Sequence, residues 1–271
     1  MSKEDLTMMS NGSVFPKSNI TEMCTECQER LSTITNIPEN FDARTKWPHC
    51  KSLRTIRNQG VCGSCWAVSS AATISDRFCI AINGSTQFEF SAEDILTCCS
   101  TCMSTNNGCE GGMPIDAWKY WIDHGVVSGG KLHSNEVVSA ANLMRYFPFN
   151  TRIIQFVNTA VLTDKRFGKN VYKISNNVKE IQGEIMTNGP VLAGFRIYED
   201  FYLYKSGVYV HTAGESRGIH AIRIIGWGVD KKKRLPYWLA ANSWGKMFGE
   251  RGLIKTLRGE NHCGIEENVI A

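Results

Sequence analysis

The segment Gln59-Gly60-Val61-Cys62-Gly63-Ser64-Cys65-Trp66 constrains the chain most, because it places a thiol where a helix is expected to begin. Helix-compatible residues continue from 66 to about 82, with apolar positions among them. The first turn of a helix carries partial positive charge and unpaired N–H groups, which bias a cysteine toward the thiolate. Because the thiolate is the nucleophilic form, Cys65 is a candidate for covalent catalysis.

Two residues far downstream are candidates for completing a catalytic set with Cys65. His220 lies at the start of an apolar, strand-like run over residues 221–227, and Asn242 follows a second strand-like run at 237–240. A histidine can take the proton of a thiol, and a third polar residue can orient the imidazole ring. The three residues therefore indicate nucleophilic catalysis.

The order of these residues along the chain resembles that of papain-like cysteine peptidases: Gln59, Cys65, His220, Asn242. Further matching segments resemble the cathepsin B branch and lie at residues 37–44, 91–99, 107–112, 189–191, 204–209 and 262–266. The resemblance implies an α+β fold with a helical left lobe, a β-barrel-like right lobe and the active site in the cleft between them. It also implies a monomeric hydrolase without cofactor or metal, whose expected partners are protein or peptide substrates and cystatin-type inhibitors.

The resemblance gives each of the four residues a chemical role. Cys65 would attack the peptide carbonyl and form an acyl-enzyme, while His220 would share its proton as a thiolate–imidazolium pair and then protonate the leaving amine. Asn242 would orient the imidazole, and Trp244 would cover that hydrogen bond from water. Gln59 Nε2 and the backbone N–H of Cys65 would stabilise the oxyanion.

The resemblance also implies where a substrate would bind. Glycine lets two backbones approach closely, so Gly111 and Gly112 are expected to carry the peptide before the cut, and Trp244 to form part of the first subsite after it. The pocket for the second residue before the cut would be lined by Pro114, Gly194, Ala221 and Asn268. Cathepsin B has a glutamate at the position of Asn268 that admits arginine, so we expect an apolar or aromatic preference here.

The stretch from about 131 to 169 departs from the cathepsin B pattern. Cathepsin B has there an occluding loop whose paired histidines bind the C-terminal carboxylate of a substrate. This stretch contains a single histidine, His133, and no cysteine. We therefore expect endopeptidase action with carboxydipeptidase activity lost. The alternative is a catalytically weak or inactive relative that acts as a binding or decoy protein.

Eleven cysteines favour an oxidising compartment. The resemblance implies the disulfides Cys50–Cys79, Cys62–Cys109 and Cys99–Cys102. Cys65 must stay free, Cys263 is expected to be a buried thiol, and Cys98 is left unpaired or joined to Cys24 or Cys27. Two rival interpretations are a thioredoxin-like redox pair at Cys62 and Cys65 and a zinc site built from Cys-x-x-Cys pairs.

The remaining composition bounds the class of protein. A net charge of +4 with both signs mixed gives no indication of nucleic-acid binding, and no apolar run is long enough for a membrane span. We expect a lysosomal, vacuolar or secreted protein, although residues 1–20 lack the pattern of a signal peptide. In that setting the sequons at Asn11, Asn19 and Asn83 are candidate glycosylation sites.

The expected organisation is one peptidase domain behind a short leading segment. Residues 1–36 resemble a truncated propeptide or form a disordered tail, and residues 37–271 form the domain. Within it we expect a helical lobe at about 45–130, the altered loop at about 131–169 and a β-rich lobe at about 168–270.

Overall fold

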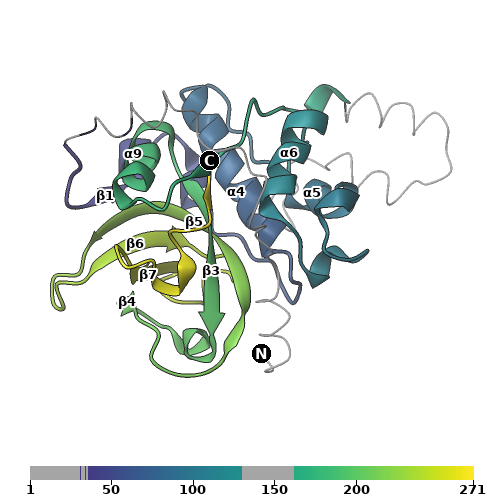
Figure 1. The fold of residues 1–271 in the computed structure, drawn as a ribbon. Helices are drawn as coiled ribbons and strands as arrows, with labels where there is room; N and C mark the ends of the chain where they lie inside the picture. The colour runs from purple at the N-terminus through teal and green to yellow at the C-terminus, as the bar shows by residue number, and fades with distance from the viewer. Residues whose placement is uncertain (1–30, 32–33, 35, 130–161) are drawn as a thin grey trace.

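The computed structural model describes residues 31, 34, 36–129 and 162–271 of the chain. These residues form two lobes, one mostly of helices and one built on a twisted sheet, which confirms the expected α+β architecture (Figure 1). None of the helices in these ranges combines the length and apolarity that a membrane crossing needs. The expectations that concern Asn11, Asn19, Cys24, Cys27 and His133 lie outside the described residues.

The helical lobe is organised around α4 (Cys65–Ala81), which begins at the residue that the sequence indicated. Small residues on several faces allow neighbours to approach it closely, and Trp66, Ala67, Ala71 and Ile74 are fully buried. The other helices of this lobe are α3 (Ala43–Lys46), α5 (Ala92–Cys98) and α6 (Pro114–His124). Short 3₁₀ turns are η1 (Lys51–Arg54), η2 (Ser100–Cys102) and η3 (Gly108–Glu110).

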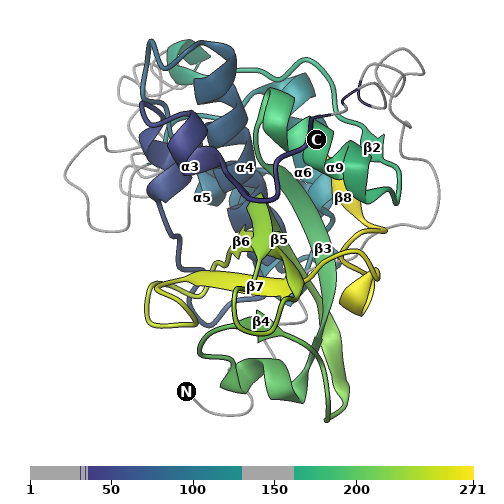
Figure 2. The same cartoon turned by 90° about the vertical axis from the view of Figure 1, so that its left-hand side faces the viewer.

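Local signals explain where two of these helices begin. The side chain of Ser91 accepts a hydrogen bond from the backbone N–H of Asp94, so it caps α5. Pro114 occupies the first turn of α6, where its missing N–H costs nothing. In the view turned by 90°, α3, α4 and α5 lie together at the top and strands β4 and β7 at the bottom (Figure 2).

The second lobe contains an eight-stranded sheet with the order β2-β8-β3-β5-β6-β7-β4, and β1 pairs with β5 beside this path. Its strands are β1 (Phe41–Asp42), β2 (Lys173–Ile174), β3 (Val191–Tyr198), β4 (Val208–Tyr209), β5 (Ser216–Val229), β6 (Pro236–Ala241), β7 (Leu253–Leu257) and β8 (Val269–Ile270). The helix α9 (Val178–Asn188) and the 3₁₀ turns η4 (Glu199–Leu203) and η5 (His262–Gly264) complete the lobe. The sheet therefore also uses β1, which precedes the helical lobe in the sequence.

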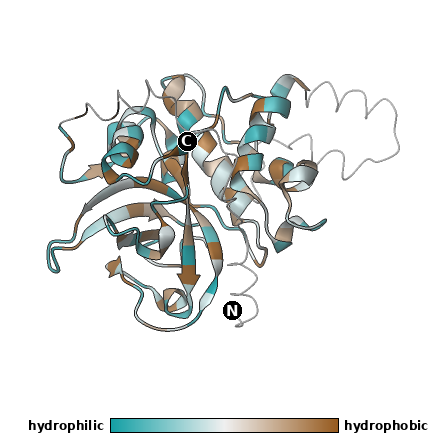
Figure 3. Cartoon of the chain, in the orientation of Figure 1, coloured by the Kyte–Doolittle hydropathy of each residue, from teal (hydrophilic) through white to brown (hydrophobic). Residues whose placement is uncertain are grey.

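The core of the sheet lobe gathers apolar side chains from β3, β5 and β6, while the turn between β5 and β6 is exposed and basic. Figure 3 shows this contrast between hydrophobic inner strands and the hydrophilic outer hairpin. Residues Lys231 to Arg234 of that hairpin form a solvated turn. Leu192, Ala221 and Ile270 belong instead to the core of the helical lobe, so the two lobes share buried surface.

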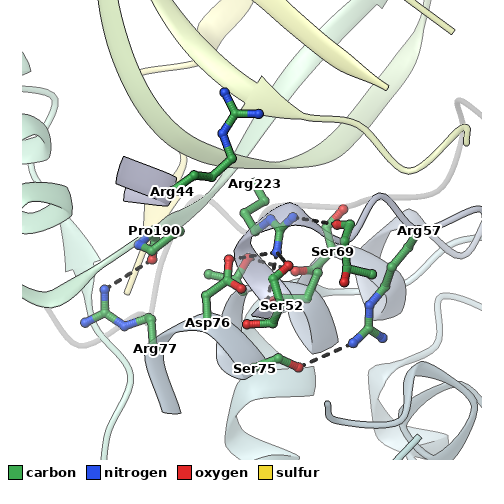
Figure 4. A network of polar contacts seen from close by, with 12 residues as sticks. Arg44, Ser52, Arg57, Ser69, Ser75, Asp76, Arg77, Pro190 and Arg223 are labelled. Atoms are coloured by element: carbon green, nitrogen blue, oxygen red, sulfur yellow. Dashed lines mark hydrogen bonds and ion pairs between the residues drawn. The ribbon is translucent and has the colours of Figure 1, made fainter. Parts of the chain in front are cut away.

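Polar contacts fasten α4 to β5 in the interior. Ser69 Oγ donates to the carbonyl of Ala221 at 2.8 Å, and Arg223 Nη1 donates to Asp76 Oδ2 at 2.7 Å. Figure 4 shows Arg223 and Asp76 directed toward each other. Both side chains of this ion pair are almost completely buried. Removing one partner of a buried pair typically costs about 3–5 kcal/mol, because the other charge remains without compensation.

Three disulfides lie in the helical lobe, and they are the pairs that the resemblance implied: Cys50–Cys79, Cys62–Cys109 and Cys99–Cys102. Cys98 is exposed and free, rather than joined to Cys24 or Cys27. Cys263 is also free, but it is only half-buried, because η5 carries it near the surface with its sulfur 3.2 Å from His262 Nδ1.

Candidate active site

Cys65 occupies the first turn of α4 and is fully buried. The loop before it is fixed by the Cys62–Cys109 disulfide and by a hydrogen bond from Gly63 N to the carbonyl of Cys109 at 2.8 Å. The sulfur of Cys65 accepts a hydrogen bond from the backbone N–H of Ala221 at 3.5 Å. The thiol of one lobe is therefore seated against β5 of the other, next to His220.

His220 is held by Asn242 in a single tautomer. The ring atom Nε2 lies 2.7 Å from Asn242 Oδ1, and the same oxygen accepts from Ser243 N at 2.8 Å. Because an amide oxygen only accepts, Nε2 must carry the hydrogen, and Nδ1 is the basic nitrogen of the neutral ring. Nδ1 is buried and has no hydrogen-bond partner in the described part of the chain.

The surroundings of His220 favour its neutral form. Burial lowers its pKa to about 4, and the hydrogen bond to Asn242 opposes this shift only in part. Next to an uncharged thiol the imidazole is therefore neutral at pH 7 and able to accept a proton. A thiolate at Cys65 would favour the imidazolium, so the two groups titrate as one unit.

Trp244 covers the ring of His220. The two ring centroids are 4.9 Å apart, and Trp244 is itself almost buried. Phe248 and Tyr202 pack against the indole, with centroid distances of 4.7 and 5.9 Å. The structure thus places the indole of Trp244 against the ring of His220.

Gln59 is fixed at both ends of its amide group. Its Oε1 accepts from Ser243 Oγ at 2.6 Å, and its Nε2 donates to the carbonyl of Cys62 at 2.7 Å. The backbone N–H of Gln59 donates to the carbonyl of Ser243 at 2.9 Å. Ser243, which sequence analysis did not single out, therefore aligns the amide of Gln59 with the start of α4. Its position directly after Asn242 was the only available signal.

The packing around Gly112 leaves no room for a side chain. A Cβ atom at this position would lie 2.5 Å from the indole of Trp66 and 2.6 Å from the carbonyl oxygen of Cys102. Gly112 faces Met103 in an isolated antiparallel bridge whose hydrogen bonds are made by the flanking residues, including Ser104 N to the carbonyl of Gly111. The N–H and C=O of Gly112 make no hydrogen bond within the described ranges, and in such a pair they point away from the partner strand.

Three of the four residues expected to line the pocket for the second residue before the cut lie together on neighbouring strands of the sheet lobe. Gly194 of β3 pairs with Ala221 of β5, and Gly194 N donates to the carbonyl of Asn268 at 2.9 Å. The side chain of Asn268 is partly exposed. Pro114 starts α6 on the other lobe, and its neighbour Met113 packs against the cluster that contains Ala221.

Sequence analysis missed the charged pair beneath this site. Residues 221–227 were interpreted as an apolar run, although Arg223 lies within them. A charged residue in an apolar strand was the available signal, because such a residue needs a buried partner. Asp76 supplies that partner.

The arrangement is suited to acyl transfer. It combines a thiol at the start of a helix, an adjacent neutral imidazole, a residue that orients the imidazole and an amide donor bonded to the loop that leads to the thiol. Among the described residues, no group of three or more His, Cys, Asp or Glu side chains could hold a metal ion.

Comparison with known proteins gives one consistent family. The profile described as papain family cysteine protease matches residues 37–271. A cathepsin B-like cysteine proteinase of Caenorhabditis elegans, number 5, is 45% identical over 256 residues, which cover 87% of this chain and 74% of the relative. A gut-specific cysteine proteinase of the same organism is 46% identical over 252 residues, covering 90% and 75%.

Solved structures of similar fold belong to the same family. A procathepsin B from Trypanosoma congolense superposes with a TM-score of 0.81 at 31% identity, over 100% of this chain and 88% of that one. A digestive procathepsin L2 of Tenebrio molitor shares the fold, with a TM-score of 0.77 at 24% identity and coverage of 100% and 80%.

The buried His220 makes stability depend on pH in a defined direction. The variant Cys65→Ser has no thiolate that could stabilise a charged His220. In this variant the pKa of His220 is about 6.5 in the unfolded chain and about 4 in the folded chain. Between these values the unfolded state binds more protons, so the free energy of unfolding falls by up to about 3 kcal/mol as pH drops from 6.5 through 4. Denaturant titrations at several pH values measure this.

The control is the double variant Cys65→Ser/His220→Asn. In this variant the free energy of unfolding should no longer fall by this amount between pH 6.5 and 4. Cys65→Ser/His49→Asn, which changes an exposed histidine instead, should keep the same dependence of the free energy of unfolding on pH. An unchanged slope in the double variant would show that His220 is not held neutral by burial.

Proposed function

Since the chain belongs to the papain family of cysteine proteases, in its cathepsin B-like branch, we propose that it is an endopeptidase acting through Cys65, His220 and Asn242. The observation that carries this proposal is the state of His220: Nε2 is bound to Asn242, and the unpartnered Nδ1 lies on the ring next to the thiol. An imidazole held in this way can take up a proton only at the nitrogen that remains.

The reaction proceeds in two halves. Cys65 Sγ attacks the peptide carbonyl carbon as its proton passes to His220 Nδ1, and the carbonyl oxygen becomes an oxyanion. Collapse of this intermediate breaks the C–N bond, and Nδ1 returns the proton to the leaving amine. Water then gives a proton to Nδ1 and attacks the thioester, which releases the new carboxyl group and the thiol.

The oxyanion requires donors that are fixed before the reaction begins. We assign this role to Gln59 Nε2 and the backbone N–H of Cys65. The bonds from Ser243 and to Cys62 restrict the amide of Gln59 to one orientation, so little reorganisation is needed in the transition state. Loss of one such donor typically costs about 3–4 kcal/mol of barrier lowering.

The substrate backbone would pair with Gly112. Its N–H and C=O make no hydrogen bond in the described part of the chain and have the alternation that an extended peptide needs. Gly111 would allow the close approach, and Trp244, beside His220, would contact the residue after the cut.

The compartment follows from the cysteines. The three disulfides among the described residues, together with a nucleophilic thiol that belongs to none of them, suit a lysosomal, vacuolar or secreted enzyme. Asn83, in the turn after α4, is exposed and therefore accessible to glycosylation in that setting. We further expect a monomer whose partners are protein substrates and cystatin-type inhibitors.

The first test is covalent labelling by an epoxide inhibitor of papain-like enzymes, followed by peptide mass spectrometry. We expect modification at Cys65, because its thiolate is the activated nucleophile, and none at the exposed thiol Cys98. The variant His220→Ala should label at least about 100-fold more slowly, since it lacks the proton acceptor. A folded protein without labelling would instead support the binding or decoy alternative.

The second test concerns the pocket at Asn268. An amide carries no charge, so the wild type should cleave a Phe-Arg substrate at least about tenfold better than an Arg-Arg substrate. Asn268→Glu should raise kcat/KM for Arg-Arg, with Asn268→Gln as the uncharged control. Equal rates on both substrates in the wild type would contradict this assignment.

The third test concerns the altered loop, most of which lies outside the described residues. If residues 131–169 do not capture a substrate carboxylate, release of C-terminal dipeptides should be slow at mildly acidic pH. Peptides with a free and an amidated C-terminus should be cut at similar internal sites and rates. A clear preference for the free carboxylate would restore carboxydipeptidase action.

A further inference from the structure

Most of the net positive charge of the chain lies in a single turn. Over the whole sequence the net charge is +4. The turn between β5 and β6 contains four consecutive cations, Lys231, Lys232, Lys233 and Arg234, and one carboxylate, that of Asp230, so its net charge is +3. The rest of the chain is therefore close to neutral. We call residues Lys231 to Arg234 the basic turn.

The cations of the basic turn are not bound to counter-charges. All four residues are exposed, and no carboxylate of the described residues lies within ion-pair distance of their side chains. Lys255 of the adjoining strand is paired with Glu250 at 2.8 Å and adds no excess charge. Lys233 acts on the carboxylate of Asp230 through space, but Oδ1 of this carboxylate already accepts hydrogen bonds from the backbone. The positive charge of the turn is thus available to a ligand.

Hydrogen bonds fix the backbone that presents these charges. Asp230 N donates to the carbonyl of Leu235, and Arg234 N donates to the carbonyl of Asp230, both at 2.8 Å. Asp230 Oδ1 accepts from the N–H groups of Lys232 and Lys233 at 3.1 and 2.7 Å. A ligand that binds here does not have to order the backbone first, which lowers the entropic cost of binding.

Arg234 occupies a position that does not favour an arginine. Its φ of 58° lies in the left-handed region, which glycine adopts freely and which disfavours a residue with a Cβ atom. Nothing in the described part of the chain accepts a hydrogen bond from its guanidinium. The local structure therefore gives no reason for a cation at this position, whereas a ligand outside the chain would.

The basic turn is remote from the candidate active site. It lies about ten residues along β5 from His220, which is roughly 30 Å at the rise of an extended strand. In Figure 1 the hairpin that joins β5 to β6 projects at the left edge of the sheet lobe, on the opposite side of the molecule from α5 and α6. A ligand bound to the turn would leave the catalytic residues accessible.

The surroundings of the turn indicate which kind of anion it suits. Peripheral binding to lipid usually needs apolar side chains beside the cations, and none of the exposed large apolar side chains of the described residues lies in this hairpin. Single-stranded nucleic acids bind through exposed aromatic faces. The aromatic residue that follows the turn, Tyr237, has Lys255 Nζ over its ring, 5.4 Å from the centroid. A sulfated polysaccharide needs neither kind of contact.

We propose that the basic turn is a docking site for a sulfated polysaccharide, which retains the protein on an anionic matrix and leaves the active site accessible. The attraction is between exposed charges and therefore weakens as salt is added. Contact with all four cations predicts that the logarithm of the affinity falls with the logarithm of salt concentration with a slope of about 3. The binding itself does not rest on the proposed function, whereas retention of an active peptidase does.

The direct test measures binding of the intact protein to a fluorescein-labelled heparin dodecasaccharide by fluorescence anisotropy at low salt. The turn variant replaces all four cations of the basic turn: K231Q, K232Q, K233Q and R234Q. The matched control removes the same charge from four exposed lysines elsewhere in the described chain: K51Q, K169Q, K179Q and K205Q.

The turn variant should bind heparin at least about tenfold more weakly than the wild type. The matched control should remain within about twofold of the wild type, because its lysines are spread over the surface. Equal weakening in the two variants would show that overall charge, rather than the basic turn, attracts the polysaccharide. That result would overturn the proposal.

A single substitution separates the charge of Arg234 from its conformation. Arg234→Gly relieves the left-handed backbone, so the Tm should not fall, while the affinity for heparin should drop by about two- to fourfold. Arg251→Gly is the control, because Arg251 is also exposed and left-handed, with a φ of 57°. It should leave the affinity for heparin unchanged. The same loss in both variants would contradict a specific role of Arg234.

The class of ligand is tested in the same assay with a DNA duplex and with vesicles of phosphatidylserine and phosphatidylcholine. Binding to either as tight as binding to heparin would overturn the assignment to a polysaccharide. Heparin should leave kcat/KM for a Phe-Arg substrate unchanged, and inhibition would instead place the polyanion at the active site. If heparin binds through the basic turn but Cys65 cannot be labelled, the docking site stands and the proposed function fails.

Discussion

The packing of α4 against β5 determines the position of almost every group discussed above. On the helix, Cys65, Ser69 and Asp76 lie four and seven residues apart and therefore share one face. On the strand, Ala221 and Arg223 are alternate residues and share the opposing face. The thiol, the hydroxyl and the carboxylate each bond to one of these two strand residues. A slip of one residue along β5 would exchange its two faces, and with them the neighbours of Cys65.

The buried pair Arg223–Asp76 is best understood as a determinant of this register. Buried ion pairs often contribute little net stability, because desolvation offsets much of the attraction. An incorrect register, however, would leave both charges unpaired in the interior, which is far more costly. Arg223 also donates to the carbonyls of Ser52 and Thr55, so it ties the segment before the helix to the same strand. We regard specificity, rather than stability, as the physical role of the pair.

Much of the fold and the composition of the site could be predicted from the sequence, because the signals there are local or belong to a recognisable pattern. The start of α4 and the three disulfide pairs are examples. The contacts made by single long-range residues could not be predicted. Nothing local shows that Ser243 aligns Gln59, that two residues at 41–42 join the sheet, or that Arg223 meets Asp76. Nor does anything local show that Gly112, which we expect to contact substrate, must also be glycine because of its contact with Trp66.

The short distance in sequence between Cys62 and Cys65 has a consequence for how the chain reaches its native state. In an unfolded chain the Cys62–Cys65 loop closes far more readily than the native Cys62–Cys109 loop, whose cysteines are 47 residues apart. Oxidation before assembly would therefore consume the nucleophile in a wrong crosslink. In the folded chain the sulfur of Cys65 is turned to the backbone of β5, and Cys62 is occupied by Cys109. A chain in which the two lobes dock and Cys62 pairs with Cys109 before oxidation of Cys65 would therefore keep the thiol that catalysis requires.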